Sequence, residues 1–253
     1  MCNVGTQPFG VLNLLVRAPV LIPRPETEDW TMRLAQFIRP TPTKPVNLLD
    51  LCTGSGCIPL LLCRLWPPGS VRATGVDISQ DAIQLSYDNA RVSEVHVPSD
   101  NLPSPPTEPP IPAQNTFLPL LANIRDPAFA RHSGLCPPFD VITSNPPYIS
   151  REEYDNLPTS VRDFEDARAL LGDPDPGHEQ GCGLTFYHEI AQLVARDGFL
   201  SDNGILAVEV GQGQAKSVER ILLDANMKAT AIWKDPWEIE RVVVASKDPA
   251  RLS

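Results

Sequence analysis

The tetrapeptide Asn145-Pro146-Pro147-Tyr148 carries the most specific chemistry in the sequence. It follows residues 139–144, a short apolar run that predicts a β-strand. Because Pro147 has no N–H, the carbonyl of Pro146 stays free to accept a hydrogen bond, and Asn145 adds a second carbonyl acceptor. Tyr148 supplies an aromatic face. Together these groups can hold a planar –NH₂ group by two acceptors and stack against its π-system.

Two acceptors on one –NH₂ group favour methyl transfer to an amide or amino nitrogen. An amide nitrogen is a weak nucleophile because its lone pair is delocalised. Hydrogen bonds from both of its N–H groups build electron density on nitrogen and aim it at a methyl sulfonium, so orientation and electrostatics supply most of the catalysis. No strong base is needed, since the proton can leave after the C–N bond forms. A plain Pro-Pro turn without chemistry is the alternative interpretation.

A glycine-rich turn, residues 50–57 (DLCTGSGC), directly follows another apolar run. Backbone N–H groups of such a turn, close to a helix N-terminus, can lie against a ligand. The turn lacks the third glycine of a dinucleotide-binding fingerprint, and the chain has no phosphate-binding loop. Asp77 ends the next apolar run, where an acid can bind ribose hydroxyls. A tight turn and a helix cap are the alternatives for these two features.

Helical and strand patterns alternate around these motifs and predict a parallel, doubly wound sheet. Residues 11–22 predict a β-hairpin, residues 150–182 a polar loop, and residues 117–124 a weak strand. The remaining strands are expected at 46–51, 71–76, 139–144, 204–210, 228–234 and 241–245, and the helices at 26–38, 58–65, 79–90, 184–200 and 214–223.

Proline is unusually frequent, with 28 among 253 residues. Eight of them fall within residues 98–119, which predicts a surface insertion at about 93–116 that is disordered or polyproline-like. Such a segment could bind an SH3-type partner, but a simple spacer is the preferred interpretation. We therefore divide the chain into a hairpin and linker, residues 1–25, and a main domain, residues 26–253.

Composition narrows the class of protein. Hydrophobic residues make up 42% of the chain, which excludes wholesale disorder. The 21 Lys and Arg against 31 Asp and Glu leave a net charge of −10, so we expect no direct nucleic-acid binding. No apolar run approaches the roughly 18 residues of a membrane span. Residues 1–10 show neither a signal-peptide nor a transit-peptide pattern.

The six cysteines include no C-x-x-C pair. That spacing disfavours a zinc cluster or a disulfide framework and favours reduced thiols in an intracellular compartment. His178 and Cys182 stand four residues apart, but two ligands do not make a metal site. We expect no bound metal.

Several stretches together identify a resemblance. They are residues 7–10 (QPFG), 21–28 (LIPRPETE), 50–58, 75–77 (GVD), 144–149, 163–165, 168–170, 204–211 and 241–244. The chain resembles the HemK-type release-factor glutamine methyltransferases over residues 7–246, apart from about 93–116. The resemblance implies a Rossmann-like class I fold of seven mostly parallel strands with an antiparallel last strand, preceded by a hairpin. It implies methylation by S-adenosylmethionine of the glutamine amide in a Gly-Gly-Gln motif.

The resemblance also assigns site residues. Asp77 takes the ribose, Arg24 and Glu26 shape the pocket from the hairpin side or form a mere charge pair, and Asn145 also contacts the cofactor. The methionine end of S-adenosylmethionine is held by Cys52, Thr53, Gly54, Ser55 and Gly56, and the adenine lies at Asn123 and Ile124. The substrate glutamine is held by Asn145, Pro146, Pro147 and Tyr148.

Three departures from the family pattern stand out. The chain begins at the hairpin, so we expect the family's helical N-terminal docking domain to be absent. Cys52 replaces the first glycine of the loop, and we expect it to fit with a negative φ. Asn123 replaces the acid on the adenine side, which removes a charge-assisted hydrogen bond.

The sequence therefore predicts a monomeric enzyme with a peptide chain release factor as its partner, located in the mitochondrial matrix or the cytoplasm, with the mitochondrion favoured by the resemblance. One alternative is an amino-methyltransferase acting on adenine in DNA or RNA. Another is a truncated, non-catalytic paralogue that only binds the cofactor. A nicotinamide dehydrogenase is disfavoured, because Asn145 to Tyr148 cannot supply hydride chemistry.

Overall fold

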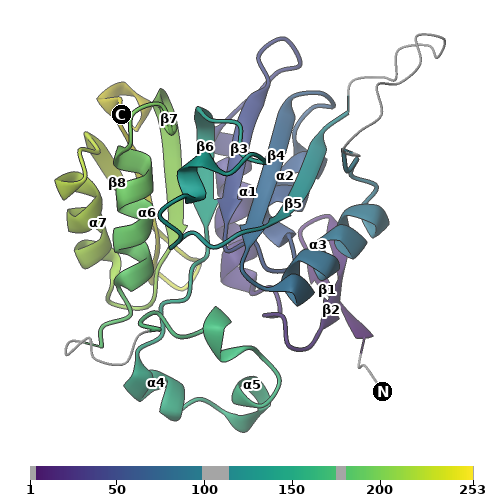
Figure 1. The fold of residues 1–253 in the computed structure, drawn as a ribbon, viewed down its shortest axis with the longest axis vertical. Helices are drawn as coiled ribbons and strands as arrows, with labels where there is room; N and C mark the ends of the chain where they lie inside the picture. Colours follow the sequence, from purple (N-terminus) through teal and green to yellow (C-terminus); the bar gives the residue numbers. More distant parts are fainter. Residues whose placement is uncertain (1–3, 99–113, 175–180, 253) are drawn as a thin grey trace.

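A seven-stranded sheet forms the centre of the molecule (Figure 1) in a computed structural model that describes residues 4–98, 114–174 and 181–252. Its strand order is β5-β4-β3-β6-β7-β9-β8, and β9 alone runs antiparallel to its neighbours. The strands are β3 (Val46–Leu51), β4 (Val71–Asp77), β5 (Thr116–Leu121), β6 (Phe139–Ser144), β7 (Leu200–Glu209), β8 (Ala229–Lys234) and β9 (Glu240–Ser246). The predicted doubly wound sheet with an antiparallel last strand is confirmed.

Helices cover both faces of this sheet, so its central strands are buried on both sides. Leu48 and Leu49, adjacent on β3, face opposite sides and are each 0% exposed. Leu48 joins a core cluster with α1 and α2, and Leu49 joins a second cluster with α6 and α7. The larger helices are α1 (Pro25–Phe37), α2 (Cys57–Leu65), α3 (Gln80–Val92), α6 (Thr185–Ala195) and α7 (Ala215–Asp224).

Helix α1 forms where the sequence predicted it. Pro25 occupies its first turn, where a missing N–H costs nothing, and Glu26 and Glu28 place negative charge at the positive end of the helix dipole. Trp30 and Leu34, one turn apart, are buried against the sheet. This packing brings the start of α1 next to the carboxyl ends of the strands.

The hairpin lies earlier in the chain than residues 11–22, which corrects the prediction. Its strands are β1 (Val4–Phe9) and β2 (Leu12–Arg17), joined at Gly10, whose φ is +57°. The first strand escaped detection because its Gly, Thr, Gln and Pro give no apolar run. Phe9, Leu12 and Leu14 belong to the core cluster of α1 and α2, so the hairpin packs on the main sheet domain.

The hairpin is also tied to α3. The amide of Asn89 accepts a hydrogen bond from the N–H of Leu15 and donates to the carbonyls of Leu15 and Ser55, at 2.7, 3.2 and 3.0 Å. One buried side chain therefore links β2 to the glycine-rich turn.

Residues 150–182 are not the plain loop that their polarity suggested. They contain α4 (Arg151–Asp155), α5 (Thr159–Arg162) and the 3₁₀ turn η2 (Ala167–Ala169), which lie beyond the carboxyl edge of the sheet (Figure 1). Ser150 and Glu153 form a reciprocal capping box at the start of α4. Helices α4 and α5 have five and four residues, which is too short for a helical period to show in the sequence.

Two other boundaries also differ from expectation, the end of α6 and the start of β7, which begins at Leu200 and not at residue 204. Helix α6 ends at Ala195 and not at residue 200, because Leu200 already pairs with Phe139 as the first residue of β7. The remaining 3₁₀ turns are η1 (Phe129–Arg131) and η3 (Pro249–Arg251).

Parts of two predictions lie outside the described residues, namely most of the proline-rich insertion, residues 99–113, and His178. Within the described ranges no three His, Cys, Asp or Glu side chains are grouped as a metal ion would need. No helix there has both the length and the apolar character to cross a membrane.

Candidate active site

Asn145 lies at the carboxyl end of β6, where its side chain reaches α1. Its Nδ2 donates to Oγ1 of Thr27 at 3.2 Å. Thr27 in turn donates to Oε2 of Glu209, the last residue of β7, at 2.7 Å. Among the described residues no donor reaches Oδ1 of Asn145, so this carbonyl oxygen stays available.

The rest of the tetrapeptide is held from both sides. Gln214 donates from Nε2 to the carbonyl of Tyr148 at 2.9 Å. Ile149 pairs with Leu171 in a parallel bridge, which closes the excursion made by α4 and α5. The tetrapeptide therefore has a fixed backbone between β6 and this bridge, with Pro146 and Pro147 both buried.

The glycine-rich turn lies along the end of the neighbouring strand β4. Thr53 donates its N–H to the carbonyl of Val76 at 2.9 Å. Gly54 and Gly56 both have positive φ, +54° and +78°. A Cβ on Gly54 would meet nothing within 4 Å, whereas one on Gly56 would press against Phe117 and Ser86 at 3.2 Å. Gly54 therefore leaves open space for a ligand, and Gly56 allows close packing of the helix that follows.

Asp77 closes the other side of this turn. Its Oδ2 accepts from the N–H of Gly54 and its Oδ1 from the N–H of Ser79, both at 2.9 Å. Burial raises the pKa of Asp77, and these N–H donors oppose that shift. A carboxylate oxygen has two lone pairs, so each retains the capacity to accept a hydroxyl.

A cavity of about 270 Å³ lies along the carboxyl ends of β3, β4, β5 and β6. The sequence-predicted residues that line it are Cys52, Gly54, Asp77, Asn123, Ile124, Asn145 and Pro147. Thr53, Ser55 and Gly56 do not line it but are buried within the turn behind it. Asn123 uses Oδ1 to accept the N–H of Arg125 at 3.0 Å, in a local turn.

A second cavity of about 150 Å³ adjoins the first. Pro146 and Tyr148 line it, together with Arg24 from the hairpin side. Arg24 forms an ion pair with Glu165, in which Nη2 donates to both carboxylate oxygens at 2.7 Å. Asn145, Leu21 and Ala169 line both cavities, so the two spaces meet at the Asn145 side chain.

Two bacterial proteins that are similar to this chain carry the same name. A release factor glutamine methyltransferase of Fusobacterium nucleatum is 34% identical over 244 residues, covering 96% of this chain and 58% of that protein. A release factor glutamine methyltransferase of Flavobacterium psychrophilum is 31% identical over 94% of this chain and 71% of its own length. This chain belongs to the release factor glutamine methyltransferases.

The family includes a eukaryotic relative named as a probable MRF1 mitochondrial N(5)-glutamine methyltransferase, mtq1 of Schizosaccharomyces pombe. It is 31% identical over 98% of this chain and 74% of its own length. The chain thus spans between just over half and three quarters of these three relatives. No protein-family model matches the chain.

Solved structures agree on the fold. A methyltransferase from Pyrococcus furiosus superposes with a TM-score of 0.54 at 12% identity, covering 90% of this chain and 88% of its own. A ribosomal protein L11 methylase from Lactobacillus delbrueckii subsp. bulgaricus gives 0.52 at 14% identity, covering 90% and 82%. The class I methyltransferase fold is therefore confirmed.

Cys52 adopts a left-handed backbone conformation, which glycine tolerates better than any other residue. Its φ is +59°, which corrects the expectation of a negative φ. A residue with a Cβ pays about 1–2 kcal/mol for this left-handed conformation. The tertiary structure imposes it, since the chain must turn sharply from β3 into the loop.

Substitutions at Cys52 should follow this backbone strain. We expect Cys52→Gly to raise the free energy of unfolding by at most about 1 kcal/mol, because the gain is partly offset by the larger entropy of the unfolded chain. We expect Cys52→Val to lower it by about 2 kcal/mol, since a β-branched side chain tolerates positive φ poorly. Urea unfolding measures both, and a Val variant as stable as the Gly variant would contradict the expectation.

The sequence prediction missed four residues that build the site, Thr27, Glu209, Glu165 and Asp50. Thr27 and Glu209 hold Asn145, and Glu165 holds Arg24. The partners are 118 to 182 residues apart, so no local pattern marks them. All four residues nevertheless fall within stretches that resemble the family, residues 21–28, 50–58, 163–165 and 204–211, and that resemblance is the signal that could have found them.

Asp50, at the carboxyl end of β3, is 0% exposed. Its Oδ1 accepts from Thr143 at 2.6 Å, and its Oδ2 has no partner among the described atoms. Burial raises the pKa of Asp50 to about 7, and the hydrogen bond from the Thr143 hydroxyl opposes that shift. A buried carboxyl group with a free oxygen at this edge of the sheet suits a ligand that carries positive charge.

Proposed function

We propose that this chain transfers a methyl group from S-adenosylmethionine to the side-chain amide nitrogen of a glutamine in a peptide chain release factor. The observation that carries the proposal is the meeting of two cavities at Asn145. The larger one borders a glycine turn and a strand-end acid, and the smaller one, about 150 Å³, is of the order of a single side chain. The names of the relatives support the same substrate class.

The larger cavity offers groups that suit S-adenosylmethionine. Gly54 leaves open space at the turn, and Asp77 can accept the ribose hydroxyls. Asp50 does not line this cavity but is buried at the same strand ends with one unpartnered oxygen, and a cationic ligand nearby would favour its ionised form. When bound, the cofactor supplies an electrophilic methyl group on a positively charged sulfur.

The smaller cavity can orient an amide for attack. Oδ1 of Asn145 and the carbonyl of Pro146 are two acceptors, which together match the two N–H groups of a glutamine amide. Fixed acceptors raise electron density on the nitrogen and hold it in one direction, which lowers the entropy cost of the reaction. Leu21, Ile149 and Leu157 line the same cavity and exclude water from the reacting nitrogen.

Methylation with a radiolabelled methyl donor tests this function directly. Purified chain is incubated with a bacterial release factor and, separately, with a mitochondrial one, each as wild type and with the glutamine of Gly-Gly-Gln changed to alanine. Label in the wild-type release factor alone supports the proposal. Label in tRNA or DNA, supplied in parallel, would favour the adenine-directed alternative. Binding of S-adenosylmethionine without transfer to any substrate would favour the non-catalytic alternative.

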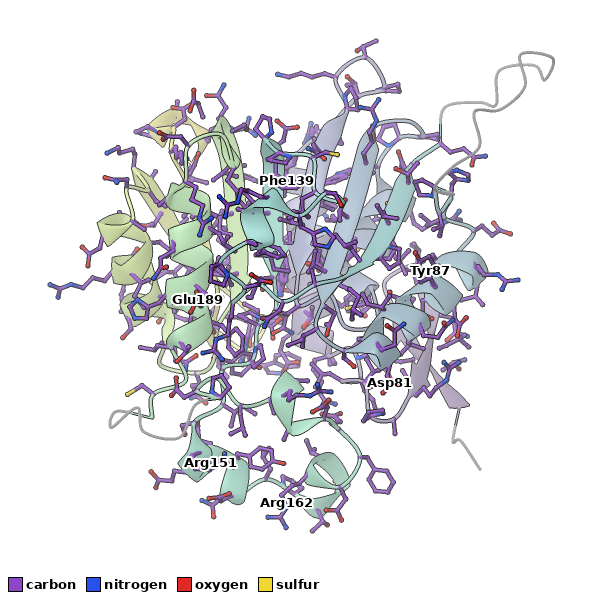
Figure 2. All side chains as sticks on the ribbon, viewed as in Figure 1. Asp81, Tyr87, Phe139, Arg151, Arg162 and Glu189 are labelled. Carbon is purple, nitrogen blue, oxygen red and sulfur yellow. The ribbon has the colours of Figure 1, made fainter. Side chains whose placement is uncertain are left out.

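Asp77 should contribute strongly to cofactor affinity. We expect Asp77→Ala to weaken S-adenosylmethionine binding by about 10- to 100-fold, since hydrogen bonds to a charged group contribute about 1.5–3 kcal/mol each. Isothermal titration calorimetry measures the dissociation constant. Asp81→Ala is the matched control, because Asp81 is exposed at the start of α3 (Figure 2) and lines neither cavity. Equal affinity of the two variants would rule out the ribose-binding role.

The proposal also covers the cellular compartment and the oligomeric state of this chain. A mitochondrial matrix or cytoplasmic location is supported by the mitochondrial relative of Schizosaccharomyces pombe and by the bacterial relatives. Fractionation of cells that express the tagged chain decides between the two compartments. We also propose that the chain acts as a monomer, which light scattering coupled to size-exclusion chromatography tests.

A further inference from the structure

Two buried donors converge on one carboxylate oxygen behind the site. Thr27 and Trp30, one turn apart on α1, donate to Oε2 of Glu209 at 2.7 and 2.8 Å. All three side chains are at most 2% exposed. Glu209 ends β7 and Asn145 follows β6, and these parallel strands pair Val208 with Ser144. The carboxylate therefore lies beside Asn145, and Thr27 lies between them.

The hydrogen bonds that link Asn145, Thr27 and Glu209 have a fixed donor and acceptor at each step. The indole N–H of Trp30 can only donate, and Oε2 of Glu209, which receives the bonds of both Trp30 and Thr27, acts as their acceptor. The hydroxyl proton of Thr27 is therefore committed to Glu209. Its oxygen is then left to accept, and Nδ2 of Asn145 donates to it at 3.2 Å.

This direction decides which way round the Asn145 amide stands. With the amide rotated by 180°, its carbonyl oxygen would face the oxygen of Thr27 with no proton between them. The –NH₂ group would then point into the cavities, where it would repel the –NH₂ of an incoming amide. In the observed orientation Nδ2 is bonded to Thr27, which leaves Oδ1 as the free polar atom of a side chain that lines both cavities.

We propose that Thr27 and Glu209 are positioning residues that fix the orientation of the Asn145 amide and thereby turn its carbonyl oxygen toward the substrate. This inference rests on the proposed function, because it assigns Asn145 the task of accepting from a substrate –NH₂ group. Neither residue lines either cavity, so both act through Asn145 and not by contact with substrate.

Removing the Thr27 hydroxyl tests the inference. We expect Thr27→Val to lower kcat with a release factor by about 10- to 100-fold, the range expected when a reacting group is displaced by about 1 Å. The affinity for S-adenosylmethionine should change by less than about 3-fold, since Asp77 and the glycine turn are untouched. Thr27→Ser, which keeps the hydroxyl, should restore kcat to within about 3-fold of wild type.

Thr31→Val is the matched control. Thr31 lies one turn further along α1, is 0% exposed and donates from Oγ1 to the carbonyl of Thr27 at 2.7 Å. It loses the same buried hydroxyl without contact to Asn145, so its kcat should remain near wild type. A loss of kcat in Thr31→Val equal to that in Thr27→Val would overturn the inference, as would failure of Thr27→Ser to recover activity.

A double variant separates positioning from general damage. If Thr27 acts only through Asn145, then Thr27→Val should add less than about 2-fold to the residual kcat loss of Asn145→Ala. Multiplication of the two losses would overturn the inference.

A spectroscopic readout keeps this inference distinct from the proposed function. In protein labelled with ¹⁵N-asparagine, the side-chain –NH₂ signals of Asn145 are identified by their absence in Asn145→Ala. Their hydrogen exchange with solvent should be slow in wild type and in Thr31→Val, and fast in Thr27→Val. If wild type methylates no release factor but this pattern holds, the proposed function fails and the orientation of Asn145 stands. If the pattern is absent in wild type, the orienting role fails.

Discussion

Replacing Asn145 with alanine should lower the rate of methyl transfer to a release factor by about 10²–10³-fold, the loss typical for removal of one group that stabilises a transition state by a fixed hydrogen bond. In the function proposed above, Asn145 supplies one of two acceptors for the substrate amide, and it stands where the two cavities meet. The Pro146 carbonyl remains, which accounts for a residual rate. Single-turnover kinetics with radiolabelled S-adenosylmethionine measure the change in the chemical step.

Asn203→Ala is the control for this variant. Asn203 is exposed near the amino-terminal end of β7, away from the carboxyl edge of the sheet. It should leave both the rate and the stability unchanged. Titration calorimetry should show that Asn145→Ala still binds S-adenosylmethionine within about 5-fold of wild type, because the glycine turn and Asp77 remain. Undiminished turnover by Asn145→Ala would end the assignment of the tetrapeptide to catalysis.

Replacing Asn115 with alanine should lower the free energy of unfolding by about 3–5 kcal/mol, a large part of the stability of a typical domain. The Asn115 side chain makes four hydrogen bonds while it is 8% exposed. Its Nδ2 donates to the carbonyls of Cys63 and Trp66 at 2.8 and 3.0 Å. Its Oδ1 accepts from the N–H groups of Ser70 and Val71 at 2.9 and 3.1 Å.

These bonds join the end of α2, at Cys63 and the C-cap residue Trp66, to the start of β4, at Val71 and the preceding Ser70. An alanine leaves three backbone groups without partners in a buried place, since the N–H of Ser70 also donates to the carbonyl of Pro67 at 3.1 Å. Each such group costs about 1–3 kcal/mol before water or local relaxation reduces the sum. Urea unfolding followed by circular dichroism measures the loss, with Asn203→Ala as the reference for an asparagine that makes no side-chain bond. A loss below about 1 kcal/mol for Asn115→Ala would show that the four bonds do not act as described.

The sequence was informative where chemistry and geometry are local. Asn145 to Tyr148, the glycine turn and Asp77 each follow an apolar run, and the carboxyl ends of parallel strands meet at one edge of the sheet, so their proximity could be predicted. The helix at Pro25–Phe37 could also be predicted, because its acidic first turn and the spacing of its buried residues can both be read from one short segment of sequence.

The errors have physical causes as well. The first strand of the hairpin, Val4–Phe9, contains too few apolar residues to be seen alone, and pairing with Leu12–Arg17 makes it a strand. Helices of four and five residues, Thr159–Arg162 and Arg151–Asp155, are too short to show a period. Cys52 takes a positive φ against its own preference because the fold requires that turn.

By itself, the sequence determined the fold class and the kind of chemistry at the site. The missing N–H of Pro147 and the amide of Asn145 are covalent properties, present in any conformation. Only the tertiary structure decided which way the amide of Asn145 faces, that Arg24 pairs with Glu165, and that two cavities meet at Asn145. Those arrangements depend on hydrogen bonds between residues more than a hundred positions apart, and such contacts leave no periodicity or motif in the chain that makes them.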